Sequence, residues 1–168
     1  MTITEFLLAR IAEDEAIASA ATEPERPGTH WQWVTSETDT PVAPGELAEA
    51  QEHQEVSLRS VEEFPTSAGA LPFFTEVGGY VHPGAGEHIT RHDPARVLAE
   101  CKAKRAIMEM HGSVHDVGWK SGEANDYLWC GSCGSIDDAP EPFPCATLKA
   151  LAVVYADHLD YDPAWATA

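Results

Sequence analysis

Three cysteines in the C-terminal half constrain the fold of this chain more than any other feature. Cys130 and Cys133 stand in the run Trp-Cys-Gly-Ser-Cys-Gly, and Cys145 follows after eleven further residues. Two thiolates separated by two residues can bind one metal ion, and a glycine behind the second lets backbone N–H groups turn toward the sulfur atoms. Cys145 is expected to begin the last helix, where the positive end of the helix dipole favours a thiolate. The spacing therefore predicts a zinc-knuckle-like loop with a structural zinc ion.

The same run has a second interpretation, because Trp-Cys-Gly-x-Cys is also the pattern of a thioredoxin-like redox pair. A redox pair of that kind follows a buried parallel strand and opens a long helix. Here residues 121–126 are polar and residues 136–144 contain three prolines, so neither neighbour fits. The flanks favour zinc over redox catalysis, and a cluster of structural thiols without metal is a third interpretation.

Zinc requires a fourth ligand, and helix geometry orders the candidates. Cys101 and His111 lie on one face of a predicted helix, ten residues apart, which is about 15 Å along the axis, so both cannot bind one ion. His111 stands at the helix end, and His115 lies in the loop that leads to the paired cysteines. We expect His111 first, then His115, then Cys101, because a mid-helix cysteine among apolar neighbours is usually a small hydrophobe.

Three helices are predicted from their start and stop signals. Thr2 and Glu5 form the pattern of a capping box, in which each side chain bonds the backbone N–H of the other residue. Asp93 can cap a second helix, and Pro94 suits its first position, where the missing N–H has no cost. The predicted ranges are 4–20, 94–111 and 145–156.

The middle of the chain predicts a small antiparallel sheet or hairpin. Strand-like runs cover 30–34, 56–61 and 71–77, and Gly78-Gly79 offers a hairpin-type turn after the last of them. We therefore predict an α+β fold with an N-terminal helix, this sheet, and two C-terminal helices bridged by the zinc-knuckle-like loop. We expect one domain over 1–168, with 35–55 a loop or arm and 157–168 a polar tail.

The charge balance excludes several classes of partner. The chain of 168 residues carries 28 acidic and 10 basic side chains, a formal net charge of −18. Such a surface repels phosphate backbones and anionic lipid, so we expect neither direct nucleic-acid binding nor membrane binding. One explanation for the excess of acidic side chains is solubility, because a high net charge keeps a protein dissolved. The alternative explanation is mimicry of DNA toward a nucleic-acid-binding protein.

Targeting signals are not visible in the sequence. Residues 1–17 contain four acidic side chains, and no window approaches the roughly 18 apolar residues that span a bilayer. Four cysteines in such a chain are typical of thiols or metal ligands rather than of a disulfide framework. We therefore expect a cytoplasmic location.

Other histidines and the tryptophans are weaker candidates. His88 and His92 stand four apart, but they precede a predicted helix start, so we expect surface histidines there. Trp31 and Trp33 are expected to be partly exposed and to form a surface for a partner. The tryptophans expected to cover the metal loop are Trp119 and Trp129.

Two stretches, from Glu87 to His111 and from Cys145 to Trp165, resemble a family of uncharacterised proteins from actinobacteria and their phages, catalogued as a domain of unknown function, family 6221. The resemblance implies an opening helix like 6–17 and a paired-cysteine loop before the last helix. It also implies that the position of His111 is usually histidine, that the position of Cys101 is usually aliphatic, and that the setting is an actinobacterium or phage. The section from Trp31 to Gly86 is longer than in relatives. The family brings no known activity.

These observations predict a non-enzymatic, zinc-stabilised acidic module that binds a protein partner, as an accessory factor of a phage or actinobacterium. Three thiolates and one imidazole would complete the coordination of zinc, and a closed site of this kind is structural. The alternatives are an acidic DNA-mimic inhibitor, whose acidic side chains should form a stripe with duplex-like spacing, and a thiol-redox or zinc-dependent enzyme, which requires an open metal position or a reactive Cys130.

Overall fold

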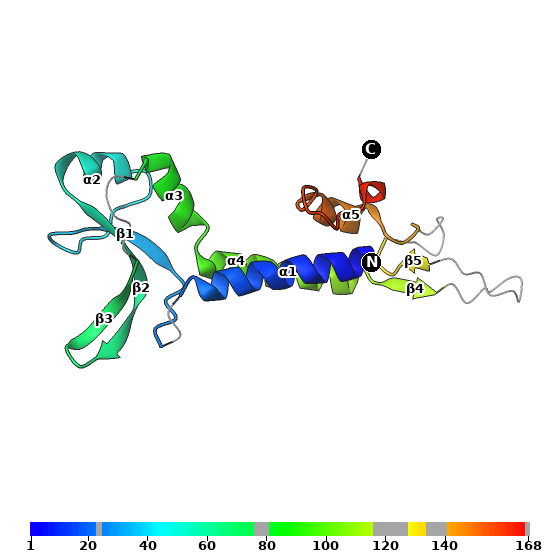
Figure 1. Ribbon diagram of the computed structural model, residues 1–168, viewed down its shortest axis with the longest axis horizontal. Helices are drawn as coiled ribbons and strands as arrows, with labels where there is room; N and C mark the ends of the chain where they lie inside the picture. The colour runs from blue at the N-terminus through cyan, green and yellow to red at the C-terminus, as the bar shows by residue number, and fades with distance from the viewer. Residues whose placement is uncertain (23–24, 76–80, 116–127, 134–140, 167–168) are drawn as a thin grey trace, which may run out of the picture. The chain divides into compact units, whose positions relative to one another are not determined.

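The structure is a computed structural model, which describes residues 1–22, 25–75, 81–115, 128–133 and 141–166 (Figure 1). The chain forms two compact units. The first comprises 1–13 and 101–168, and the second comprises 14–100, so the division falls within the two long helices α1 (Ile3–Ala20) and α4 (Pro94–Met110). The organisation of 1–168 as one domain stays a prediction.

The start of α1 is fixed by the predicted capping box, which is confirmed. The backbone N–H of Thr2 donates to Glu5 Oε2 at 2.8 Å, and the N–H of Glu5 donates to Thr2 Oγ1 at 3.2 Å. These bonds satisfy donors that the first turn of a helix leaves without partners. Hydrogen bonds from the backbone and side chain of Thr2 also lower the pKa of the Glu5 carboxyl. The helix runs to Ala20, as predicted.

The sheet of the second unit is three-stranded and antiparallel, in the order β1-β2-β3. Its strands are β1 (Trp31–Thr35), β2 (Val56–Thr66) and β3 (Gly69–Thr75). The predicted α+β class is therefore confirmed. β2 is longer than the strand predicted over 56–61, because it continues to a tight turn at residues 67–68. The turn predicted at Gly78-Gly79 lies outside the described residues.

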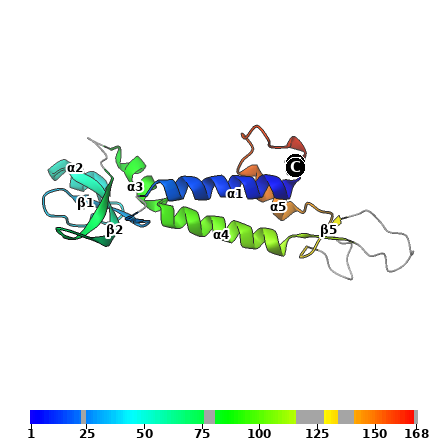
Figure 2. The same ribbon diagram turned by 60° about the horizontal axis from the view of Figure 1, so that its bottom comes forward.

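Two short helices, α2 (Leu47–His53) and α3 (Pro83–Arg91), lie side by side in this unit (Figures 1 and 2). The sequence analysis had not predicted α3. Trp33, Leu47 and Leu58 form the buried core here, each at most 4% exposed. Trp33 and Leu58 are cross-strand partners in the register of β1 and β2, so the sheet places them together for α2 to cover.

Asp93 and Pro94 begin α4 as predicted. Asp93 Oδ1 accepts the backbone N–H of Arg96 at 2.9 Å, which is the N-cap bond. Its second oxygen accepts the N–H of Trp31 at 3.3 Å, and the N–H of Ala95 donates to the carbonyl of Thr29 at 3.0 Å. The buried carboxylate therefore joins the helix start to the beginning of β1.

The first unit is organised around Phe6 of α1, whose side chain is fully buried. Tyr155, Tyr161 and Trp165 surround it with ring centroids 5.1 to 6.2 Å away. They follow α5 (Ala146–Val153), and Trp165 ends the short 3-10 helix Pro163–Trp165. Arg10, one turn after Phe6, contacts His158 and forms an ion pair with Glu13 at 2.8 Å. The C-terminal segment thus packs on α1 through aromatic edges.

No helix among the described residues has the length and apolar character that a membrane span requires.

Candidate metal centre

Four side chains from separate elements converge beyond the end of α4. His111 follows the last residue of α4, Cys130 ends β5 (Leu128–Cys130), Cys133 lies in the turn after it, and Cys145 is the N-cap of α5. Their ligand atoms all lie within 4.8 Å of one another. Cys130 and Cys145 are buried, whereas His111 and Cys133 are half-buried. These are the four residues that the sequence analysis selected as ligands.

The distances within this cluster match a coordination shell. His111 Nδ1 lies 3.4 Å from Cys130 Sγ, 3.2 Å from Cys133 Sγ and 3.6 Å from Cys145 Sγ. One ring nitrogen carries at most one N–H, so it cannot donate hydrogen bonds to three sulfurs together. A tetrahedral zinc ion, with bonds of about 2.3 Å to sulfur and about 2.0 Å to nitrogen, separates each sulfur from the nitrogen by about 3.6 Å.

A short hairpin places Cys130 against the end of α4. β4 (Ser113–His115) pairs with β5 in antiparallel register, and Ser113 is opposite Cys130. The N–H of Gly131 donates to the carbonyl of Gly112 at 2.9 Å, and Ser132 Oγ donates to the carbonyl of Met110. The loop between Cys130 and Cys133 is therefore bonded directly to the residues that flank the histidine. The sequence analysis predicted the loop but not this hairpin.

A second set of bonds brings Cys145 to the same point. The N–H of Cys130 donates to the carbonyl of Glu141 at 3.0 Å, and the N–H of Phe143 donates to the carbonyl of Leu128 at 2.9 Å. Glu141 also accepts the N–H of Ala146, in the first turn of α5, through its carboxylate at 2.6 Å. The segment before α5 thus runs beside β5, and the helix starts at the cluster.

The pKa values of two thiols in the cluster are shifted in opposite directions. Burial raises the pKa of Cys130. Hydrogen bonds from the backbone N–H groups of Ser132 and Cys133 and from the side chains of His111 and Cys145 outweigh burial, and they lower the pKa to about 7. Burial, with the adjacent sulfurs of Cys130 and Cys145, raises the pKa of Cys133 to about 12. Thiolates this close repel one another, and a cation among them removes that repulsion. The donor set therefore fits a metal ion.

The other candidates lie elsewhere or outside the described side chains. Cys101 is buried within α4 and is not a member of the cluster, as the length of the helix predicted. The side chain of His115 and the whole of Trp119 lie outside the described residues. Trp129 is half-buried and immediately precedes Cys130 in β5. His88 and His92 lie in the second unit, with ring centroids 4.4 Å apart at the C-terminal end of α3.

The fold and this cluster define an α+β protein with a Cys3His group that is compatible with a metal site. Over residues 1–167 the chain matches the model of a family described as a family of unknown function (DUF6221), and it belongs to that family. No match was found among curated proteins. None was found among solved structures.

Proposed function

We propose that the chain is a non-enzymatic protein-interaction module whose first unit is stabilised by zinc bound to His111, Cys130, Cys133 and Cys145. The observation that carries the proposal is the position of one imidazole nitrogen 3.2 to 3.6 Å from three sulfur atoms. Neither a hydrogen-bond network nor a disulfide pair requires this arrangement, whereas a tetrahedral ion does.

The donor set supports zinc rather than a hard cation. Three thiolates and one imidazole are soft or borderline ligands, and a tetrahedral site of this composition is typical of zinc. Calcium and magnesium require oxygen ligands. The carboxylate of Glu141 accepts the N–H of Ala146 in the first turn of α5. The chemistry that bound zinc supplies here is therefore cross-linking rather than Lewis-acid activation of a water molecule.

The position of the cluster supports a structural role. Its four ligands come from the end of α4, the strand β5 with its turn, and the N-cap of α5. Four protein ligands complete the tetrahedral shell and leave no position for a substrate. An ion that joins three elements separated in sequence contributes its binding free energy to folding, about 10 kcal/mol or more for structural zinc in small domains. The hairpin β4–β5 has only three residues a strand, and so small a hairpin is marginally stable by itself.

The charge of the chain supports a protein partner. With a formal net charge of −18, the surface repels nucleic acid and anionic lipid and attracts basic protein surfaces. We place this module in the cytoplasm, as an accessory factor of an actinobacterium or its phage, which is the setting that the family resemblance implies.

Cobalt substitution tests the proposed site directly. Apo protein prepared under reducing conditions should bind one equivalent of Co²⁺, with thiolate-to-metal charge transfer in the near ultraviolet and intense visible bands of a tetrahedral ion. Zinc should displace the bound Co²⁺, so the visible absorbance should disappear after one equivalent of zinc has been added. The weak visible bands of an octahedral ion would show that water completes the shell, and the closed structural site would then be wrong.

A further inference from the structure

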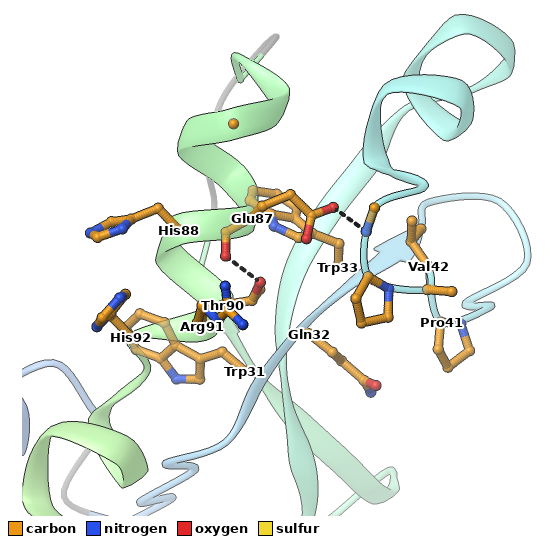
Figure 3. A pocket seen from close by; sticks show the side chains of 14 residues that line it. Trp31, Gln32, Trp33, Pro41, Val42, Glu87, His88, Thr90, Arg91 and His92 are labelled. Atoms are coloured by element: carbon orange, nitrogen blue, oxygen red, sulfur yellow. Dashed lines mark hydrogen bonds between the residues drawn. The ribbon is translucent and has the colours of Figure 1, made fainter. Parts of the chain in front are cut away.

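A pocket of about 1010 Å³ opens in the second unit, away from the cysteines in sequence (Figure 3). Three consecutive residues of β1, Trp31 to Trp33, line it together with the loop 41–45 and one side of α3. Side chains alternate between the two faces of a strand, so Trp31 and Trp33 lie on one face of β1 and Gln32 lies on the other. Figure 3 shows α3 on one side of this pocket and the loop on the other.

The indole N–H groups of both tryptophans in the pocket are already bonded. Trp33 Nε1 donates to the carbonyl of Gly86 at 2.9 Å, and Trp31 Nε1 donates to the carbonyl of Gly28 at 3.1 Å. Each indole has a single donor, so neither ring has an N–H left for a ligand. A side chain at Gly86 would collide with Leu47, which shows how closely α3 approaches the core here. Trp33 is only 4% exposed, so an apolar or flat group can pack on the half-buried Trp31 ring alone.

At the edge of β1 that faces the pocket, one backbone carbonyl and one backbone N–H are placed to bond one residue of another chain. The N–H of Trp31 is taken by Asp93, and the carbonyl of Trp33 is taken by the N–H of Val42 at 2.8 Å. The N–H of Trp31 and the carbonyl of Trp33 both point away from β2. Because the N–H and carbonyl of one strand residue point the same way, the carbonyl of Trp31 and the N–H of Trp33 also point to this outer edge. Neither forms a hydrogen bond among the residues that the structure describes. One residue of an extended chain, aligned parallel to β1, can bond both groups at once.

Arg91 lines the same pocket and carries a positive charge. Glu87 stands four residues before it on α3, the spacing at which the two usually pair on a helix. The Glu87 carboxylate instead accepts the N–H of Gly45 at 2.9 Å and ties the loop to the helix. The Arg91 guanidinium forms no ion pair within the described part of the chain. Because Arg91 has no carboxylate partner among the residues that the structure describes, its charge can pair with a carboxylate from outside.

We propose that this pocket binds a short extended peptide of a partner protein, which carries an apolar residue for the Trp31 ring and a carboxylate for Arg91. Its backbone continues the sheet at the outer edge of β1, so that main-chain bonds supply affinity and the side chains supply specificity. One carboxylate is expected rather than an acidic run, because the net charge of −18 opposes a polyanion. This inference rests on the proposed function as an interaction module and names the chemistry of its partner.

Selection from a phage-displayed library of random 12-residue peptides tests it, with the full zinc-loaded chain as bait. Selected peptides should share an acidic residue within a few positions of an aromatic or aliphatic one. Calorimetry with the synthetic peptides should show that Arg91→Gln weakens binding about 10-fold or more, the usual loss for a charge-assisted bond. The matched control is Lys102→Gln, which removes the same charge from an exposed position on α4 and should change Kd less than twofold.

Two further variants of the peptide make the result specific. Replacing its acidic residue by the neutral amide should weaken binding to the natural chain but not to Arg91→Gln, and N-methylation of one backbone amide should weaken both. Failure to enrich any peptide, peptides without an acidic residue, or binding unaffected by Arg91→Gln would overturn the proposal. A cross-linked partner protein insensitive to Arg91→Gln would overturn this inference and leave the interaction module standing.

Discussion

The pair of variants Cys145→Ala and Cys101→Ala tests what a metal contributes, because the two cysteines are equally buried. Both cysteines are buried, at 0% and 1% exposed, and both belong to the first unit. Each substitution removes one sulfur atom from a packed interior and should cost about 1 kcal/mol of unfolding free energy through the cavity. Only Cys145 is a member of the Cys3His cluster.

The additional cost at Cys145 follows from the coordination shell. Structural zinc in small domains contributes about 10 to 16 kcal/mol, so one ligand of four accounts for about 3 kcal/mol. At about 1.4 kcal/mol for each factor of ten, the zinc affinity of Cys145→Ala should fall roughly 100-fold, while that of Cys101→Ala stays within about twofold. In excess zinc, Cys145→Ala should lower the free energy of unfolding by about 3 kcal/mol beyond the cost of its cavity, whereas Cys101→Ala should show the cavity cost alone.

Competition against a chromophoric chelator under reducing conditions measures the affinities, and thermal unfolding with and without EDTA measures the stabilities. EDTA should lower the Tm of the natural chain and of Cys101→Ala by more than it lowers the Tm of Cys145→Ala. Equal zinc affinities for the two variants would refute the reasoning, since the geometry would then have no bearing on metal binding.

Three further predictions concern the second unit. Asp93→Ala should lower the unfolding free energy by about 2 kcal/mol in urea denaturation, because it removes the cap of α4 and leaves a backbone N–H of β1 without its acceptor. Gly86→Ala should cost about 1 to 3 kcal/mol in the same assay, because its Cβ would overlap the Leu47 side chain. The hydrogen bond to Glu62 raises the pKa of His30. Its contribution of a few tenths of a kcal/mol should be present below about pH 6.5 and lost as the pH rises through the raised value. NMR titration should show that pKa falling in Glu62→Gln, and an unchanged pKa would contradict the pairing.

The parts of the fold that the sequence predicts are those encoded by local chemistry. The start of α1 depends on Thr2 and Glu5, and the start of α4 depends on Asp93, so both could be recognised from side chains within one turn. The selection of Cys130, Cys133 and Cys145 rested on spacing in the same way, and the distance along one helix ranked His111 above Cys101.

The parts that the sequence does not predict depend on tertiary contacts. α3 contains Gly84 and Gly86, which disfavour a helix, and it forms where Gly86 packs against Trp33 and Leu47. The strands β4 and β5 have three residues each, too short for an alternating pattern, and their pairing is tied to the cluster. The pocket at β1 could not be predicted, because it combines a strand edge, a loop and a helix face that only the fold brings together.

Zinc content is the measurement that tests the central claim most directly. Protein purified freshly under reducing conditions, without added metal or chelator, should contain close to one equivalent of zinc by elemental analysis. Cys133→Ser, which removes one ligand of the cluster, should contain far less under the same conditions. Less than about half an equivalent in the natural chain, or equal zinc in both proteins, would contradict the site built from His111, Cys130, Cys133 and Cys145.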